Sequence, residues 1–227
     1  MTSNFRSKNE VVYDLLREDI LQGKFKPGSR LVIDELAVKL GVSQIPIREA
    51  MRQLEADGFV TIAPYVGATV TEFDADFIFE VFALLESLEI ISSRAACSLM
   101  SEESLNQLAE IVNAMEASVQ NPSEWSRENK EMHLFICREA NTRLVMKMMQ
   151  KVLDHWDRLR LHYLKDVFAN RIYAAQKEHH LILEAFYSRD PDEVERVIRQ
   201  HNQTALASYI SHLESIGELG KREEQSS

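Results

Sequence analysis

The feature that most restricts the fold of this chain is a helical spacing of apolar residues over residues 74–216. Apolar residues recur there three and four positions apart, as they do on one face of an α-helix. Polar interruptions of the kind found at helix ends divide the segment into about six helices; they fall near residues 101–102, 121–122, 141–142, 167–168 and 189–191. Six helices of this length predict an all-α bundle.

Composition agrees with a helical, water-soluble protein. The 227 residues include only 7 glycines and 5 prolines, which argues against a turn-rich all-β fold. No apolar run approaches the roughly 18 residues of a membrane span, and no hydrophobic stretch follows the basic residues at the N-terminus. Cys97 and Cys137 are too few for a disulfide framework and fit a reducing compartment. We therefore expect a cytoplasmic protein with no membrane segment.

The first 73 residues have a different pattern. A helix, a short helix, a glycine turn, a third helix and two β-like stretches follow one another; we expect them at residues 11–21, 33–40, 43–56, 59–63 and 68–72. This is the order of a winged helix-turn-helix with a small β-hairpin wing. The predicted organisation is mainly α, with a DNA-binding domain, a helical ligand-binding and dimerisation domain, and a polar tail, at residues 1–73, 74–216 and 217–227.

The third helix has two chemically distinct faces. Ile47, Met51 and Leu54 share one face and should pack inward. The other face carries polar residues at helical spacing, namely Gln44, Arg48, Arg52 and Glu55. A glutamine can bond adenine at two atoms, and an arginine can bind guanine or a phosphate. The alternative is a small three-helix domain whose polar faces are merely solvated.

Charge gives this interpretation no support. The chain carries a net charge of −10, and residues 1–74 hold 9 Lys and Arg against 11 Asp and Glu. Because binding to nucleic acid depends on local patches of charge, the prediction of DNA binding has to be based on a sequence motif.

Motifs in this part of the chain carry a family resemblance. They are Leu-x-Gly-x-x-x-Pro-Gly-x-x-Leu at residues 21–31, Glu35-Leu36-Ala37, Leu40-Gly41-Val42-Ser43, Pro46-Ile47-Arg48-Glu49-Ala50 and Leu54-x-x-x-Gly58. With this spacing, residues 9–72 resemble the GntR family of bacterial transcription regulators. The resemblance implies a double-stranded DNA operator as partner and assigns an operator contact to Arg48.

Some positions depart from the family pattern. Gln44 stands where the family usually has arginine, Ile45 where it has threonine, and Val66 where an arginine often precedes Gly67. Gln44 therefore predicts a preference for adenine. Further candidate DNA contacts are Ser43 at the helix start, Lys39, Arg52, and Tyr65 and Gly67 in the wing. Each has a plain alternative, since a surface Lys or Arg can be merely solvated and Tyr65 can pack on its own hairpin.

Three of the seven histidines, His133, His179 and His201, fall on three different predicted helices. Imidazoles from separate helices can converge only inside a bundle, where they suit zinc, nickel or a similar divalent ion. Asn129 lies one turn before His133 on the same face. The alternative is a set of separate buried histidines, and Cys137 is either a further ligand or a small buried hydrophobe.

Residues 76–209 resemble the FCD ligand-binding domain of the FadR branch of GntR regulators. The matching elements are Leu88-Glu89, Met132-His133 with Asn141, Glu178-His179-x-x-Ile182-Leu183-x-Ala185, and residues 190–201. The resemblance implies a divalent metal held by an aspartate and by His133, His179 and His201. Asn129 occupies the aspartate position. This amide predicts a weaker site, a softer metal, or a shell that a carboxylate effector completes.

The same resemblance implies a small organic acid as effector, bound beside the metal. Leu85 stands where an arginine is common in that branch. Arg138, Arg158 and Arg160 are then the candidate partners for an anion, with solvation or salt bridging as the alternative.

These expectations combine into a homodimeric, ligand-responsive transcription regulator that represses its target. A second reading is a metal sensor in which the ion itself is the signal. A third is a hydrolytic zinc enzyme. No motif places a general base, and the N-terminal domain has no role in that reading, so we expect no enzyme.

Overall fold

A computed structural model describes residues 7–63, 67–215 and 217. The chain forms two compact units that divide between Phe73 and Asp74. Tyr65 and Val66, which the sequence assigns to the tip of the wing, lie outside the described residues, as does the predicted tail apart from Gly217.

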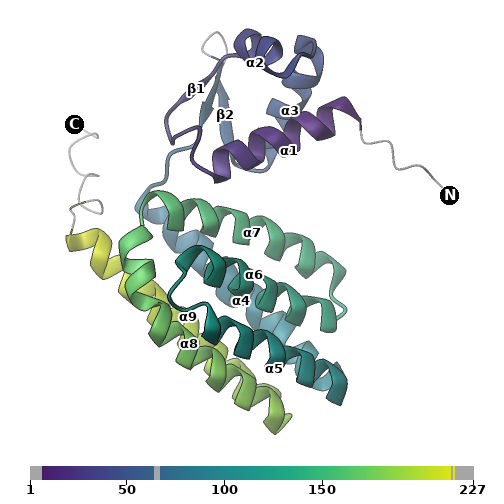
Figure 1. The fold of residues 1–227 in the computed structure, drawn as a ribbon, viewed down its shortest axis with the longest axis vertical. Helices are drawn as coiled ribbons and strands as arrows, with labels where there is room; N and C mark the ends of the chain where they lie inside the picture. The colour runs from purple at the N-terminus through teal and green to yellow at the C-terminus, as the bar shows by residue number, and fades with distance from the viewer. Residues whose placement is uncertain (1–6, 64–66, 216, 218–227) are drawn as a thin grey trace, which may run out of the picture. The chain divides into compact units, whose positions relative to one another are not determined.

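The N-terminal unit is a winged helix-turn-helix (Figure 1). Its elements are α1 (Lys8–Leu21), β1 (Arg30–Leu31), α2 (Ile33–Leu40), α3 (Gln44–Ala56), β2 (Val60–Ala63) and β3 (Gly67–Val70). The strands form an antiparallel sheet in the order β1-β3-β2. The predicted two-stranded wing is thus a three-stranded sheet. The added β1 has two residues, too short for a strand to show an alternating pattern.

The core of this unit gathers the apolar faces of all three helices. Ile47, Met51 and Leu54 are buried, as the spacing on α3 predicts. They pack with residues of α1 and of the sheet, including Leu16, Ile20, Val60 and Val70. This packing fixes which face of α3 is left exposed.

The C-terminal unit is a bundle of six helices within the described residues (Figure 1). They are α4 (Ala75–Leu99), α5 (Glu102–Ala117), α6 (Pro122–Glu139), α7 (Arg143–His162), α8 (Lys165–Ser188) and α9 (Pro191–Ser215). The side chains of Asp74, Ser101 and Asn121 accept backbone hydrogen bonds at the starts of α4, α5 and α6. These caps explain why polar residues marked the helix ends.

One helix boundary was predicted wrongly. The interruption expected at residues 167–168 lies inside α8, and the chain instead turns at Tyr163 and Leu164. Leu164 is fully buried, so the apolar spacing continues through the turn. Without a glycine or proline there, the sequence carries no strong signal that a helix ends.

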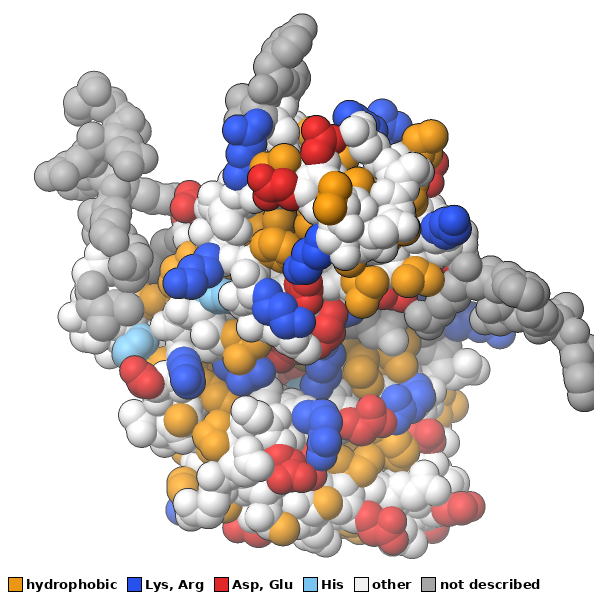
Figure 2. All heavy atoms as spheres, turned by 45° about the horizontal axis from the view of Figure 1, so that its top comes forward, with side chains coloured by type: hydrophobic (Ala, Val, Ile, Leu, Met, Phe, Trp, Pro, Cys, Tyr) orange, Lys and Arg blue, Asp and Glu red, His pale blue; other side chains and the backbone are white. Residues whose placement is uncertain are grey.

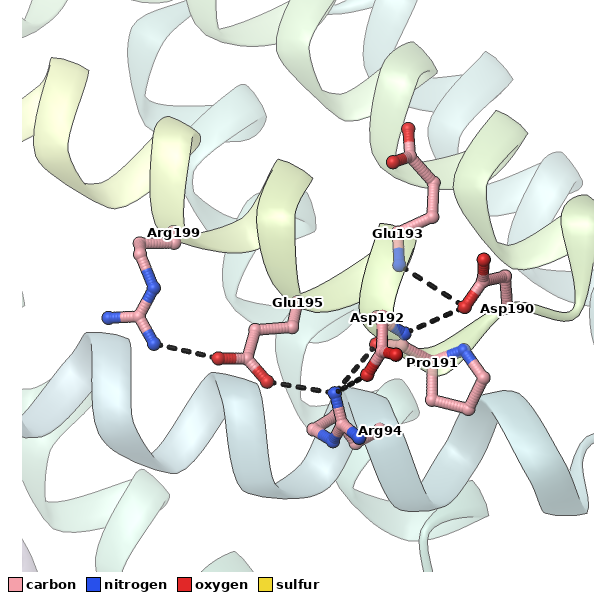
Figure 3. A network of polar contacts seen from close by, with 7 residues as sticks. All are labelled: Arg94, Asp190, Pro191, Asp192, Glu193, Glu195 and Arg199. Carbon is pink, nitrogen blue, oxygen red and sulfur yellow. Dashed lines mark hydrogen bonds and ion pairs between the residues drawn. The ribbon is translucent and has the colours of Figure 1, made fainter.

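Helix α4 is central to the bundle and packs against α6, α7 and α9, while α8 packs against α5 and α9. A polar network joins α4 to the first turns of α9 (Figure 3). Arg94 donates to Asp192 at 2.7 Å and to Glu195 at 2.8 Å, and Arg199 donates to Glu195 at 2.8 Å. The network links the exposed edges of α4 and α9 near the start of α9.

None of the described helices is long and apolar enough to cross a membrane.

Candidate DNA-reading surface and metal centre

The exposed face of α3 presents the predicted DNA contacts to solvent. Gln44, Arg48 and Arg52 are all exposed. Ser43 is the N-cap residue of α3, but its side chain makes no capping hydrogen bond. Its hydroxyl and the first N–H groups of the helix together suit a phosphate.

Gln44 is held on both sides of its amide. Its Nε2 donates to Oδ1 of Asp34 at 2.6 Å, and a guanidinium N–H of Arg48 donates to its Oε1 at 3.3 Å. Asp34 lies in the first turn of α2 and was not among the residues singled out from the sequence. Asp34 reaches Gln44 only because the turn between α2 and α3 brings the two helices together, and the spacing of residues along the chain does not show this contact.

A groove of about 460 Å³ runs beside α3 and the sheet, and Arg30, Arg48 and Arg52 line it. Gly67 lies at its edge with a φ of +102°, and a Cβ there would stand 3.5 Å from Nε of Arg30. A side chain at this position would be strained. Arg30 is a further basic residue that the sequence reading missed.

Lys39 is exposed, yet it already has partners. Its ammonium lies 3.7 Å from Asp19 and 5.4 Å from the ring centre of Phe25. On the face drawn in Figure 2, basic and acidic side chains are interspersed and form no continuous basic field. The negative net charge of the chain therefore favours DNA contacts made by a few individual residues.

In the C-terminal unit, His133 of α6, His179 of α8 and His201 of α9 converge. All three are buried, and one ligand atom from each lies within 4.8 Å of the others. The ring centres of His179 and His201 are 5.0 Å apart, and each is about 6 Å from that of His133, at 6.1 and 6.3 Å. Three imidazoles at this spacing could hold a divalent metal.

His179 and the neighbouring Asn129 have buried polar atoms without hydrogen-bond partners. Both ring nitrogens of His179 and Oδ1 of Asn129 are buried and make no hydrogen bond. Buried polar atoms in folded proteins nearly always have a partner. A metal ion would supply one for His179, and these orphaned atoms therefore fit a metal at this point.

Carboxylates hold the other two rings. Nδ1 of His133 lies 3.1 Å from Oε1 of Glu89, and Nδ1 of His201 lies 2.6 Å from Oε2 of Glu178. A proton on each Nδ1 satisfies these contacts and leaves the Nε2 lone pair available. Such carboxylate–histidine pairs orient metal ligands and raise their basicity.

Burial also sets the protonation of the rings. It lowers the pKa of His133, and it lowers the pKa of His179 well below its ordinary value, helped there by the neighbouring imidazoles. Both rings are therefore neutral at pH 7, which is the form that binds a metal. Burial opposes ionisation of Glu178, but the hydrogen bond from His201 and the charge of Arg171 hold its pKa below the usual range.

Trp125 covers the histidine cluster from one side. Its ring stacks on that of His179 with centroids 5.4 Å apart and planes 13° from parallel. The indole N–H donates to Gln176 at 3.0 Å, and Gln176 donates in turn to the carbonyl of Val112 at 2.9 Å. This chain of contacts fixes the indole ring and hence the plane of His179.

A small cavity adjoins the cluster, with about 50 Å³ of room for water-sized molecules. Its polar lining includes Asn129, His133, His201, Glu89 and Arg171, and its aromatic lining includes Phe82, Trp125, Trp156, Phe168 and Tyr209. Arg171 is buried, its NH2 group donates to Glu178 at 2.7 Å, and its Nε has no partner. This arginine can bind an anion inside the cavity.

None of the three arginines proposed from the sequence as anion partners is part of the cavity lining. Arg138 is half-exposed and pairs with Glu131. Arg158 is almost fully buried, with an N–H 3.4 Å from the His155 ring. Arg160 lies over the ring of Phe168 at 5.0 Å, so it is the nearest of the three to the lining.

No motif or spacing in the sequence pointed to Arg171, whose guanidinium pairs with Glu178 seven residues further along α8. Leu85, which replaces an arginine of related proteins, does line the cavity. Cys137 is buried, burial raises the pKa of its thiol, and it is not in the group of described residues that could hold a metal.

Comparison with known proteins matches both units. Residues 8–70 match the family described as bacterial regulatory proteins, gntR family, and residues 80–204, more than half of the chain, match the FCD domain. The chain belongs to the GntR family of transcription regulators. Its FCD domain places it in the FadR subfamily, as the resemblance implied.

Other GntR regulators align along most of this chain. The uncharacterized HTH-type transcriptional regulator YdhC of Bacillus subtilis is 29% identical over 214 residues, 92% of each chain. The HTH-type transcriptional repressor RspR of Escherichia coli K12 is 25% identical over 197 residues, 86% of each. The structure of E. coli McbR/YncC has the same fold, with a TM-score of 0.74, 23% identity, and coverage of 91% of this chain and 99% of that one.

Membership of this family confirms the predicted fold class and the DNA-binding regulator. GntR proteins are transcription regulators, so the hydrolytic enzyme reading is excluded. The individual DNA contacts, the metal and the effector of this chain stay predictions.

Proposed function

We propose that this chain is a homodimeric repressor released from its operator by a small monocarboxylate, which binds beside a divalent metal in the FCD domain. The observation that carries the proposal is the buried cluster of His133, His179 and His201 next to a cavity that contains Arg171. Zinc and nickel are the preferred ions, because both accept imidazole ligands.

The formal charges around the cavity favour a monoanion. Glu89 and Glu178 bring two negative charges, and Arg171 brings one positive charge. With neutral histidines and the neutral amide of Asn129, a divalent ion would change the net charge from −1 to +1. A buried net charge is costly unless it is compensated, so a ligand with one carboxylate suits the metal-loaded cavity.

The shape and lining of the cavity restrict the ligand further. About 50 Å³ of room accommodates only a few non-hydrogen atoms without side-chain movement. Phe82, Trp156 and Tyr209 add aromatic surface to the polar groups of the lining. A short acid with a compact apolar part fits this mixed lining better than a di- or tricarboxylate.

An exposed stripe on α4 supports a dimer. Leu84 is 43% and Ile91 is 51% exposed, and they lie seven residues apart on the same helical face. Val81 and Leu85 on the adjoining face of α4 are buried core residues. An apolar stripe of this kind suits packing against a second copy.

Repression by release follows from reciprocal coupling. If the effector favours an arrangement of the two heads that fits the operator less well, DNA must weaken effector binding by the same factor. The relative RspR is named as a repressor, which supports repression rather than activation by this chain.

The second candidate is a metal sensor, and Asn129 is the observation that favours it. An amide oxygen binds a divalent ion less tightly than a carboxylate, so the ion would exchange more readily and could itself act as the signal.

Operator binding with defined additions separates the two candidates. The operator is first selected from fragments of the source genome at a stated salt concentration. Its affinity is then measured with zinc or nickel alone and with short monocarboxylates added to the loaded protein. Release only by a monocarboxylate supports the proposal, whereas release by metal alone supports the sensor. No response to any of these would contradict both.

His179→Ala tests the metal site itself. Metal should raise the Tm of the natural protein, because a ligand that binds only the folded state stabilises it. The variant should show no such rise. An equal rise in both proteins would mean that His179 does not bind the ion, and His180→Ala, one residue along α8, is the matched control.

A further inference from the structure

We propose that Asp34 determines base specificity by orienting the amide of Gln44. This inference rests on the proposed reading of DNA by α3 and adds a residue from α2 to it. The two side chains meet at 2.6 Å across the turn between the helices. Asp34 acts here as a positioning residue, and Gln44 is the group that touches the base.

The partners of Gln44 leave its amide only one orientation. An ionised carboxylate accepts hydrogen bonds and cannot donate them, and a guanidinium donates and cannot accept. The nitrogen of the amide must therefore face Asp34, and its oxygen must face Arg48, as the structure has them. Without Asp34, only the longer contact with Arg48, at 3.3 Å, would hold the amide in this orientation.

The two contacts leave the amide able to bind a base. A primary amide has two N–H donors and two acceptor lone pairs. Asp34 takes one donor and Arg48 fills one lone pair, so the amide still has one donor and one acceptor for a base. Adenine presents the complementary pair in the major groove, an acceptor at N7 and a donor at N6.

The negative charge of Asp34 allows a role in base specificity to be distinguished from a role in overall DNA affinity. Asp34 is exposed and lines the groove that Arg30, Arg48 and Arg52 also line. A carboxylate among arginines that would meet phosphates weakens the attraction to DNA of any sequence. Its removal should therefore strengthen binding to random DNA while weakening discrimination between bases.

The test selects binding sites from a pool of randomised duplexes with the full-length protein and four variants. The variants are Asp34→Ala, Asp34→Asn, Gln44→Ala and, as a matched control for lost charge, Glu35→Ala. For each protein the base preferences are determined, and affinity is measured for the preferred site and for a random duplex at one salt concentration.

We expect Gln44→Ala to lose the preference for adenine at one position of each half-site. Asp34→Ala should lose preference at the same position, with a drop of about tenfold in the ratio of specific to random affinity and an unchanged or higher affinity for random DNA. Asp34→Asn offers a donor as well as an acceptor, so it no longer restricts the amide to one orientation and should retain only part of the preference. Glu35→Ala should retain all of it.

Two results would overturn the inference. The first is an altered base preference for Gln44→Ala but a natural one for Asp34→Ala. The second is an equal gain in specific and random affinity for Asp34→Ala, which would make the carboxylate a source of repulsion only. If Gln44→Ala itself has the natural preference, the proposed reading by Gln44 fails first. Should Asp34→Ala fail to fold, an unchanged base preference in Asp34→Asn would decide against orientation by the carboxylate.

Discussion

At the scale of single residues, the unpaired ring of His179 lowers the stability of the metal-free protein. Its two buried ring nitrogens have no partner, and each such group costs about 1–3 kcal/mol. The neighbouring rings of His133 and His201 avoid this cost through Glu89 and Glu178. A ligand that bonds to His179 therefore relieves an instability that the rest of the cluster does not share.

The same residue predicts a pH dependence of the metal-free protein. In the unfolded chain His133 and His179 take up protons below a pKa of about 6.5, whereas burial lowers the pKa of both in the folded protein. Stability is therefore full above about pH 7 and falls as the pH decreases, by up to about 1.4 kcal/mol per pH unit for each residue.

Denaturant unfolding of the chelator-treated protein between pH 5 and pH 8 measures this dependence. His179→Ala should flatten the slope, because it removes the ring whose pKa burial lowers well below its ordinary value. A natural protein with equal stability at pH 5.5 and pH 7.5 would show that the two rings are not buried in the neutral form.

The sequence predicted the three histidines but not the residues that orient them. Histidines on separate helices are visible as a pattern, and the family resemblance joins them. The pairing of Glu178 with His201 connects α8 to α9 across 23 positions, and only the packed bundle defines it. Arg171 was missed for the same reason, since its role depends on which cavity its helix face borders.

At the scale of elements, the amphipathic helices were the most predictable parts. The buried face of α3 follows directly from the spacing of Ile47, Met51 and Leu54. Elements too short to show a hydrophobic spacing were harder to predict from the sequence, as β1 and the turn at Leu164 show. Short strands depend on partners distant in the sequence, and a turn made of buried apolar residues resembles continuing helix.

Leu54→Ala tests how α3 is held. Leu54 is fully buried in the core of the N-terminal unit, and removal of a buried leucine side chain typically costs about 2–5 kcal/mol. Because the chain forms two compact units, we expect calorimetry to show a lower Tm for one transition and an unchanged Tm for the other. Val38→Ala is the control, since Val38 is 84% exposed. Equal shifts of both transitions would show that the units unfold together.

At the scale of the whole molecule, a protein with a net charge of −10 has to bind a polyanion. Basic and acidic side chains are interspersed on the face in Figure 2, so a single head gains little from long-range attraction. In the dimer that we propose, two joined heads would overcome this, because the second binds at a high effective concentration once the first is in place.

Comparison of a full operator with a single half-site tests this dependence. A duplex with both half-sites should bind about a hundredfold or more tightly than a duplex with one. Lengthening the spacer by about half a helical turn, roughly 5 base pairs, should remove most of the difference, because the half-sites then face opposite sides of the DNA. A gain of twofold or less for the full operator would indicate that each head binds alone.

The stacking of Trp125 on His179 gives the protein an optical reporter of its own. The chain has 2 tryptophans, Trp125 and Trp156, and both line the cavity. The N-terminal unit contains none. Intrinsic fluorescence excited at the indole band therefore originates entirely from the cavity walls, and titration with an ion or an acid can be followed without any label. A change in the same fluorescence during titration with operator DNA would show that DNA binding by the heads alters the environment of the tryptophans in the helical bundle.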